Sequence, residues 1–229
     1  MLAKTWEHFP ASIYRDRAER NRFLARTFAN ELRGGVLNVG GGGEKHLAEW
    51  LPASARYVEV DIAGKPDLIV DLERELPLPF EDRSFDTVVC TEVLEHVDNL
   101  HAVLAELCRL ADRQVIISLP NAWATLKSEI VRPTGSSGKF YGLPASRPED
   151  RHKWFFNFTE AERFLAEAGQ AHGFAAGRWL SCGYVHDHGL QTGLRLACGL
   201  LLGDKARFNL FATTIWVMLE RQSPRPEAP

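Results

Sequence analysis

Four consecutive glycines form the first candidate site in this sequence. Gly40 to Gly43 directly follow the apolar stretch Val36 to Val39. Glycine tolerates positive φ and lets a backbone approach a ligand closely, so a glycine run after a buried strand favours a ligand-binding loop over a merely flexible one. A dinucleotide fingerprint needs a third glycine where Lys45 or His46 stands. The loop therefore predicts a cradle for a ligand other than a dinucleotide pyrophosphate.

Two aspartates follow the next two predicted strands. Asp61 ends one strand and Asp71 follows the other. An acid in the first position can accept hydrogen bonds from both hydroxyls of a ribose, and an acid in the second can receive an adenine amino group. Each alone is equally typical of a turn cap. Together with the glycine loop, they lie at the carboxyl ends of successive strands. This combination favours one ligand-binding site along that edge of the sheet.

Two histidines are candidates for acid–base chemistry. His152 lies beyond a long irregular segment and is suited to act as a general base, because imidazole titrates near neutrality. A histidine that hydrogen-bonds a loop is an equal alternative. His96 is the second catalytic candidate, although packing or capping of its turn is the favoured interpretation. His186 and His188 lack further ligand residues nearby in the sequence, so no metal is predicted.

The elements that must position these residues alternate between strand and helix. This alternation predicts an α/β fold, a parallel sheet with helices on both faces. The predicted strands span 36–39, 57–61, 68–70, 85–90, 114–119, 178–185 and 213–220. The predicted helices span 15–33, 44–51 and 99–110, with a further apolar helix at 191–203. Another helix is predicted to begin at an N-cap Thr159 with Glu162 completing a capping box, and to end at Gly169.

Composition and charge exclude several classes of protein. The 229 residues carry 27 Lys plus Arg against 30 Asp plus Glu, and 45% of them are hydrophobic. Collagen-like, coiled-coil and wholly disordered chains are excluded on this composition. The formal charge of -3 weighs against nucleic acid as the main partner.

Cysteine spacing and hydropathy indicate the compartment. The four cysteines have no C-x-x-C spacing, which favours a reducing, cytoplasmic setting. The N-terminus lacks the apolar block of a signal peptide. The run Leu194 to Leu202 contains Arg195 and is too short to span a bilayer, so no stable membrane insertion is expected.

One long stretch carries a family resemblance. Residues 71–97, which include Leu76-Pro77-Leu78-Pro79-Phe80 and Thr91-Glu92-Val93-Leu94-Glu95-His96-Val97, resemble class I S-adenosylmethionine-dependent methyltransferases. The nearest resemblance is to the ubiquinone/menaquinone-biosynthesis-type branch. The segment Val115 to Asn121 resembles the fifth strand of the same family and the loop after it. The resemblance implies a Rossmann-like, seven-stranded, mostly parallel sheet whose last strand is antiparallel, with S-adenosylmethionine as cofactor.

The resemblance also implies roles for individual residues. In the family a glycine loop passes under the methionine part of the cofactor, and Gly40, Gly41 and Gly42 correspond to it. Asp61 corresponds to the acid that binds the ribose, and Ile62 lies where the family has a residue beside the adenine. Asp71 and Leu72 correspond to residues at the edge of the adenine. Thr91 and Glu92 map to the floor near the sulfonium. Asn38 stands where the family usually has an acid, and is expected to orient the loop by hydrogen bonding. Glu44 stands where the family usually has a third glycine.

The resemblance and the element pattern together predict the domain organisation. Residues 1–33 are expected to form a helical segment over the cofactor site, and residues 34–221 the methyltransferase domain. Within that domain, 121–158 is expected to be a substrate loop and 186–212 a helical insert. The tail at 222–229 holds three prolines and is expected to be disordered.

The expected activity is methyl transfer to a small-molecule, lipid or glycan-linked acceptor. Aromatic residues occur in three segments expected to shape the acceptor site: Trp6, Phe9, Tyr14, Trp123, Phe140, Tyr141, Trp154 and Phe208. They favour an apolar or ring-bearing acceptor without excluding a glycan. The apolar insert favours a core helix or a homodimer contact over a membrane-surface contact.

Two alternatives to this activity stay open. The departures at Asn38 and Glu44 motivate a non-catalytic, methyltransferase-like binding or partner protein. A nicotinamide-dependent oxidoreductase is disfavoured by the missing third glycine.

Overall fold

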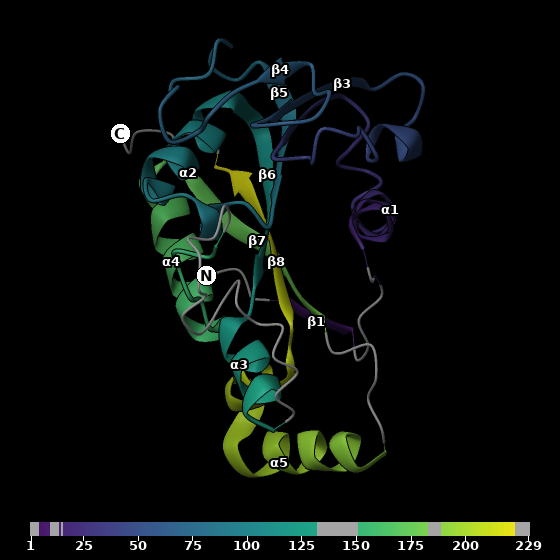
Figure 1. The fold of residues 1–229 in the computed structure, drawn as a ribbon, viewed down its shortest axis with the longest axis vertical. Coiled ribbons are helices and arrows are strands. Elements are labelled where there is room, and N and C mark those ends of the chain that lie inside the picture. Colours follow the sequence, from purple (N-terminus) through teal and green to yellow (C-terminus); the bar gives the residue numbers. More distant parts are fainter. Residues whose placement is uncertain (1–4, 10–13, 15, 132–150, 183–188, 223–229) are drawn as a thin grey trace, which may run out of the picture.

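Eight strands form one sheet in the computed structural model, which describes residues 5–9, 14, 16–131, 151–182 and 189–222. The strand order is β1-β7-β8-β6-β5-β2-β3-β4 (Figure 1). The bounds are β1 Thr5–Phe9, β2 Gly35–Val39, β3 Arg56–Asp61, β4 Leu68–Ile69, β5 Phe85–Thr91, β6 Ala111–Pro120, β7 Phe174–Cys182 and β8 Thr214–Arg221. Strand β8 runs antiparallel to both β6 and β7, and the other pairs are parallel. The predicted Rossmann-like fold with an antiparallel last strand is confirmed.

The eighth strand was not predicted. β1 lies within the N-terminal segment that the sequence indicates as helical, and it pairs in parallel with β7, with Thr5 opposite Arg178. Its five residues, Thr-Trp-Glu-His-Phe, contain none of the valines or isoleucines that indicated the other strands. Their partner strand, β7, lies far away along the chain. The pairing therefore depends on the tertiary structure, which the local sequence does not reveal.

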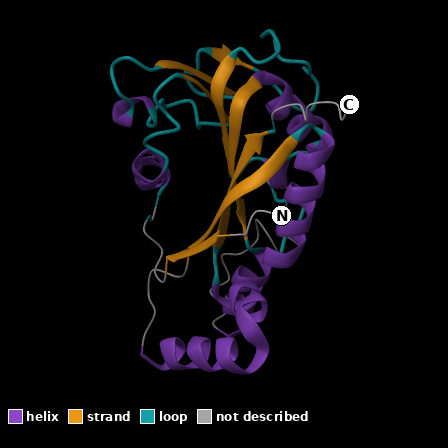
Figure 2. Cartoon of the chain, turned by 180° about the vertical axis from the view of Figure 1, so that it is seen from behind, coloured by secondary structure: helices purple, strands orange, loops and turns teal. Residues whose placement is uncertain are grey.

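Helices cover both faces of the sheet, as Figure 2 shows from behind. On one face α2 (Leu100–Leu110) and α4 (Phe158–Ala171) pack in the larger core with Val88 and Cys90 of β5. On the other face α1 (Arg17–Thr27) packs in a second core with Val89. Because successive side chains of a strand point to opposite faces, a continuous apolar run in β5 supplies both cores.

Two local predictions were wrong. Residues 44–51 are a loop with a single 3-10 turn, Ala48–Trp50, because Lys45 adopts a left-handed φ of +54° that a helix cannot accommodate. Helix α4 is capped by Asn157, whose side chain accepts from the backbone of Glu160 at 2.8 Å. The capping box thus lies two residues before the predicted Thr159, and the helix continues past Gly169 to Ala171.

The predicted substrate loop begins as a helix. Residues Ala122–Val131 form α3 directly after β6, and Asn121 begins it by accepting from the backbone of Trp123 at 3.2 Å. Residues 132–150 lie outside the described part of the chain, as does the proline-rich tail after Gln222. The apolar insert forms α5 (Gly189–Phe211), which is broken at Gly203, where φ is +83°. No helix within the described residues is long and apolar enough to cross a membrane.

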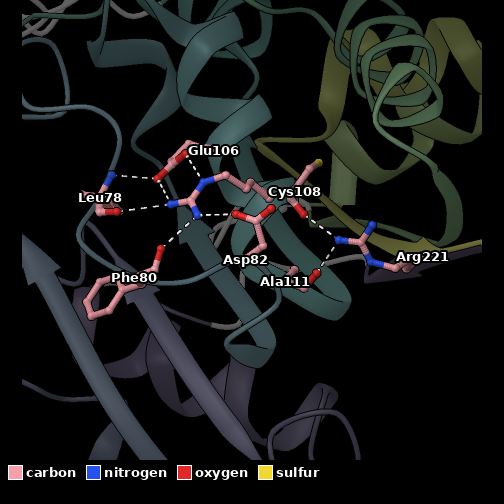
Figure 3. Close-up of polar contacts among 8 residues, drawn as sticks. Leu78, Phe80, Asp82, Glu106, Cys108, Ala111 and Arg221 are labelled. Carbon is pink, nitrogen blue, oxygen red and sulfur yellow. Dashed lines mark hydrogen bonds and ion pairs between the residues drawn. The ribbon is translucent and has the colours of Figure 1, made fainter.

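An arginine at the end of α2 fastens the connection between β4 and β5. The Arg109 guanidinium donates to the carbonyl of Phe80 at 2.9 Å and to Asp82 at 2.7 Å, and it pairs with Glu106 at 2.7 Å. Glu106 in turn accepts from the backbone of Leu78 at 2.7 Å, as drawn in Figure 3. This network holds the residues that follow the Asp71 turn against the body of the protein.

Candidate active site

One cavity of about 990 Å³ opens at the carboxyl edge of the sheet. Five of its lining residues come from the ends of five different strands: Gly40 after β2, Asp61 in β3, Asp71 after β4, Glu92 after β5 and Pro120 in β6. Ligands of open α/β sheets bind at this edge. The volume is at the upper end of the range for small-molecule sites.

The glycine loop is shaped so that side chains are excluded from it. Gly40, Gly42 and Gly43 have φ values of +72°, +98° and +69°. A Cβ on Gly43 would lie 2.3 Å from the carbonyl oxygen of Ala63, and one on Gly41 would lie 2.2 Å from Glu59 Oε2. Gly40 lines the cavity, whereas Gly41 and Gly42 are not among the lining residues and pack against neighbouring side chains.

A buried polar network supports the loop from below. The Asn38 amide donates to Tyr57 Oη at 2.9 Å and to Glu59 Oε2 at 3.2 Å, and the Tyr57 hydroxyl donates to the same carboxylate. Burial, followed by the bond to Glu59, raises the pKa of Tyr57 far above its usual value. Asn38 therefore lies beneath the loop, with 1% of its surface exposed, and is not among the residues that line the cavity.

Glu59 is a residue that sequence reasoning missed. It is fully buried, and its second oxygen accepts from the backbone of Lys45 at 3.3 Å. The signal was an acid between two valines of a predicted strand, where a charged group needs a specific reason to be buried. Glu44, by contrast, pairs with His46 at 2.6 Å and is 66% exposed at its side chain.

The two predicted aspartates line the same cavity. Asp61 accepts from the backbone of Gly42 at 2.7 Å and of Ala63 at 3.2 Å, which joins the end of β3 to the glycine loop. Asp71 accepts from the backbone of Glu73 at 2.9 Å, the geometry of a turn cap. Ile62 and Leu72, the neighbours of these acids, also line the cavity.

Helix α1 supplies two arginines to the cavity wall. The Arg20 guanidinium donates to Glu92, which follows β5 and has a left-handed φ of +54°. Arg17 lies against the glycine loop, since a Cβ on Gly42 would meet its guanidinium at 2.1 Å. The sequence did not single out either arginine, because the helical pattern was read from its apolar positions alone. Thr91 is buried in β5 and is not among the lining residues.

The two candidate histidines meet in the wall of the same cavity. His96 ends the 3-10 turn Leu94–His96, and the ring centroids of His96 and His152 lie 4.6 Å apart at an edge-to-face angle of 86°. Between them lies Glu95 Oε1, 3.8 Å from His96 Nε2 and 3.9 Å from His152 Nε2. Glu95 was not predicted, although it directly precedes His96. Its side chain is fully buried and lines the cavity.

The predicted aromatic residues do not form the described wall of the cavity. Tyr14 packs against Phe23 and Trp216, and Phe208 packs against Phe158, so both belong to the cores. Trp154 donates from its indole to the carbonyl of Val97 at 2.8 Å, and Trp123 is exposed on α3. The side chains of Trp6, Phe9, Phe140 and Tyr141 lie outside the described residues, as do His186 and His188. Apart from Val97, the described lining residues next to the two histidines are instead polar: Glu95, His96, Asp98, Arg151, His152 and Lys153.

Comparison with known proteins identifies one family model. The model described as a methyltransferase domain matches residues 11–175, which is more than half of the chain. A search of curated proteins found no match.

Several solved structures share the fold at low sequence identity. An S-adenosylmethionine-dependent methyltransferase from Archaeoglobus fulgidus has a TM-score of 0.56 and 16% identity, over 90% of this chain and 95% of that chain. Magnesium protoporphyrin IX methyltransferase from Synechocystis PCC 6803, solved with bound S-adenosylhomocysteine, has a TM-score of 0.54 and 16% identity over 90% and 83%. The 1,6-didemethyltoxoflavin-N1-methyltransferase of Burkholderia thailandensis has a TM-score of 0.51 and 14% identity over 90% and 79%.

Proposed function

The chain belongs to the methyltransferase-domain family and is an S-adenosylmethionine-dependent methyltransferase, and from this premise we propose that it methylates a small-molecule, lipid or glycan-linked acceptor. The observation that carries the proposal is one cavity that is lined by Gly40, Asp61 and Asp71 and also by His96 and His152. We propose that the first three residues, the cofactor half, hold the cofactor and that the two histidines, the acceptor half, hold the acceptor beside it.

The residues of the cofactor half fit an adenosyl group. The glycine loop turns through conformations that exclude side chains, so its backbone at Gly40 is free to approach a ligand. Asp61 would accept from the ribose hydroxyls, Ile62 would cover the adenine, and Asp71 with Leu72 would meet its edge. A second family, nicotinamide-dependent enzymes, is not favoured, because the loop lacks the fingerprint's third glycine.

The charges around the glycine loop suit the amino-acid end of the cofactor. Arg17 lies against Gly42 and would attract the carboxylate. Glu92, which Arg20 holds in place, offers a negative charge near the ammonium and the sulfonium. We propose that Asn38, Gly41, Gly42 and Thr91 support this end from behind rather than by direct contact with the ligand.

When bound, S-adenosylmethionine supplies a methyl group on a sulfonium sulfur that keeps the electron pair of the broken bond. The acceptor contributes the pair of the new bond, so the task of the chain is to hold the acceptor atom in line with the methyl group. We propose His152 and His96 as the catalytic residues that contact the acceptor. Their polar surroundings favour an acceptor with a polar reacting group over a wholly apolar one.

The finer identity of the acceptor stays a proposal. The resemblance of residues 71–97 to the ubiquinone/menaquinone-biosynthesis-type branch supports a ring-bearing acceptor on a lipid.

We also propose a cytoplasmic location, which the four free and buried cysteines support. A homodimer stays a prediction; Leu194, Leu200 and Leu201 of α5 are 61%, 88% and 81% exposed, and light scattering after size-exclusion chromatography would test it.

Calorimetric titration with S-adenosylmethionine tests the cofactor half. We expect micromolar binding, and we expect Asp61→Ala to weaken it at least tenfold, because the variant loses the ribose acceptor and the bonds to Gly42 and Ala63. Asp112→Ala, an exposed change on β6, is the matched control and should bind as the wild type does. Equal affinity in the Asp61 variant would contradict the ribose assignment.

A second measurement tests turnover. The protein is incubated with labelled cofactor and a set of hydroxylated aromatic, lipid and glycan acceptors, and S-adenosylhomocysteine formation is followed. His152→Ala should lose most of the turnover and keep the cofactor affinity, because we assign this histidine to the acceptor. Cofactor binding without acceptor-dependent turnover would support the non-catalytic alternative.

A further inference from the structure

We propose that Glu95, His96 and His152 form a binding site for a divalent transition-metal ion in the wall of the cavity. The sequence predicts no metal here, because His152 lies far from the Glu95-His96 pair along the chain. The fold brings one carboxylate and two imidazoles together, with one ligand atom from each within 4.8 Å of the others.

The distances suit an ion between these groups. Glu95 Oε1 lies 3.8 Å from His96 Nε2 and 3.9 Å from His152 Nε2, beyond the length of a hydrogen bond. Two ligand atoms on one tetrahedral ion, each at about 2.1 Å, are roughly 3.4 Å apart. The two Glu95 separations would therefore close with a shift of about half an ångström, and the remaining ligand pair, which lies within 4.8 Å, with a shift of up to about 1.4 Å.

Burial and ligand type point to the kind of ion. The side chains of Glu95 and His152 are 0% and 6% exposed, and that of His96 is 23% exposed. The candidate ligands are thus largely removed from bulk water, which strengthens their interaction with a cation. Two imidazoles with one carboxylate suit zinc, iron, cobalt or manganese, whereas magnesium and calcium prefer oxygen ligands.

The backbone holds the two halves of the site in register. The carbonyl of Glu95 accepts from the backbone of Lys153 at 2.7 Å and of Trp154 at 3.3 Å. The Lys153 ammonium also reaches Asp98 at 2.9 Å, and the Trp154 indole reaches the carbonyl of Val97. The segment that carries His152 is thus fastened to the turn that carries His96, as a preorganised metal site requires.

Three protein ligands leave coordination positions open, which is the arrangement of a catalytic rather than a structural metal. All three residues line the cavity, so those positions face the acceptor half. Resting on the proposed function, we infer that an oxygen atom of the acceptor completes the coordination and that the acceptor is a hydroxyl compound. Its oxygen would form the new bond to the methyl carbon with a lone pair, the sulfur would keep the pair of the broken bond, and the hydroxyl proton would leave to water.

Cobalt(II) titration of the chelator-treated full-length protein, without cofactor, tests the site. We expect one equivalent to bind with visible absorption bands typical of four or five ligands. Glu95→Gln and His152→Ala should each weaken this binding at least tenfold. His172→Ala, an exposed histidine at the end of α4, should bind as the wild type does. The double change His186→Ala/His188→Ala controls for the other histidine pair and should also leave the bands unchanged.

The outcomes separate the metal site from the methyltransferase proposal. Calorimetry with S-adenosylmethionine is repeated on each variant; an unchanged cofactor affinity shows that the variant is folded and that its loss of cobalt is local. Absence of the bands, or bands that survive in both Glu95→Gln and His152→Ala, would overturn the site while cofactor binding stands. Acetohydroxamate should shift the cobalt bands, because it chelates through open positions. Bands that do not respond to it would overturn the inferred oxygen acceptor.

Discussion

At the scale of single residues, the acid that supports the glycine loop comes from an unexpected strand. Asn38 occupies the position on β2 where a carboxylate was expected, and Glu59 on β3 provides a buried carboxylate beside it, 3.2 Å away. Asn38 and Glu59 are direct partners in the parallel register of the two strands. A carboxyl group under the loop is therefore retained although its position in the sequence differs.

Gly41→Ala should disturb this arrangement. The added Cβ would lie 2.2 Å from Glu59 Oε2 and 2.4 Å from Asn38 Nδ2, so the buried network must shift. We expect a loss of about 1–3 kcal/mol in the free energy of unfolding, measured by urea denaturation, and weaker cofactor binding. Gly193→Ala, where no atom lies within 4 Å in helix α5, is the control and should be neutral or slightly stabilising. Equal stability of the two variants would contradict this account.

Asp67 links the glycine loop to β3 and predicts an acid-sensitive contact. Partial burial raises its pKa, but the hydrogen bonds from Lys45 and from the backbone of Glu59 outweigh that effect, so the pKa lies below its ordinary 3.8. Because the folded-state pKa is depressed, the contact stabilises the protein above the ordinary pKa and is lost as the pH falls below it. Asp67→Asn should therefore flatten the pH dependence of urea stability below about pH 4. An identical slope in wild type and variant would argue against this role.

At the scale of elements, helix termini decide how the segment bearing His152 enters α4. Asn157 and Glu160 satisfy the first backbone donors of the helix in a capping box. The Thr159 hydroxyl, which the sequence suggested as the cap, accepts instead from the Asn209 amide of α5 at 2.9 Å. A residue suited to capping can thus be used for helix–helix contact when a neighbouring residue already caps.

Asn157→Ala should cost about 1 kcal/mol of unfolding free energy, because the N-terminal donors of α4 lose a partner. Glu167→Ala, an exposed change in the middle of the same helix, is expected to stay within about 0.5 kcal/mol of the wild type. Thermal and urea denaturation measure both. A loss in Asn157→Ala no larger than that in the Glu167 variant would contradict the capping role of Asn157.

Helix α1 links the N-terminal part of the chain to the site. It packs on the sheet through Phe23 and Leu24, with Phe28 directly after it, and it presents Arg17 and Arg20 from its first turns to the cavity. The arginine–carboxylate bond from Arg20 to Glu92 connects this helix to the end of β5. The shape of the cavity near Glu92 therefore depends on the docking of α1 as well as on the sheet.

At the scale of the whole molecule, the sheet separates two hydrophobic cores, and each core contains cysteines. All four are free and buried. Cys108 belongs to the core under α2 and α4, and Cys182 to the core under α1. Burial raises the pKa of each of these two thiols to about 12. Burial also raises the pKa of Cys90 far above its usual value.

Thiol reactivity should consequently follow global unfolding. In the Cys198→Ser variant at pH 8, we expect the three remaining thiols to react with Ellman's reagent only as fast as the protein unfolds, because the thiolate is both scarce and inaccessible. Denaturation in guanidinium should expose all three at once. Rapid labelling of one thiol under native conditions would reveal an opening of one core that is independent of the other.

The sequence by itself determined the alternation of strands and helices, the glycine loop and the two aspartates at the carboxyl edge. These features are local: apolar runs, glycine conformations and residues at strand ends can be read without knowing their neighbours. The same holds for the family resemblance, which rests on contiguous motifs.

The tertiary structure decided the contacts between residues that lie far apart in the sequence. Pairing of β1 with β7, the contact of Glu59 with Asn38 and the reach of Arg20 to Glu92 each join segments from different elements. The meeting of Glu95 and His96 with His152 is of the same kind. Such contacts follow from packing and strand register, which a linear pattern of residue types does not contain.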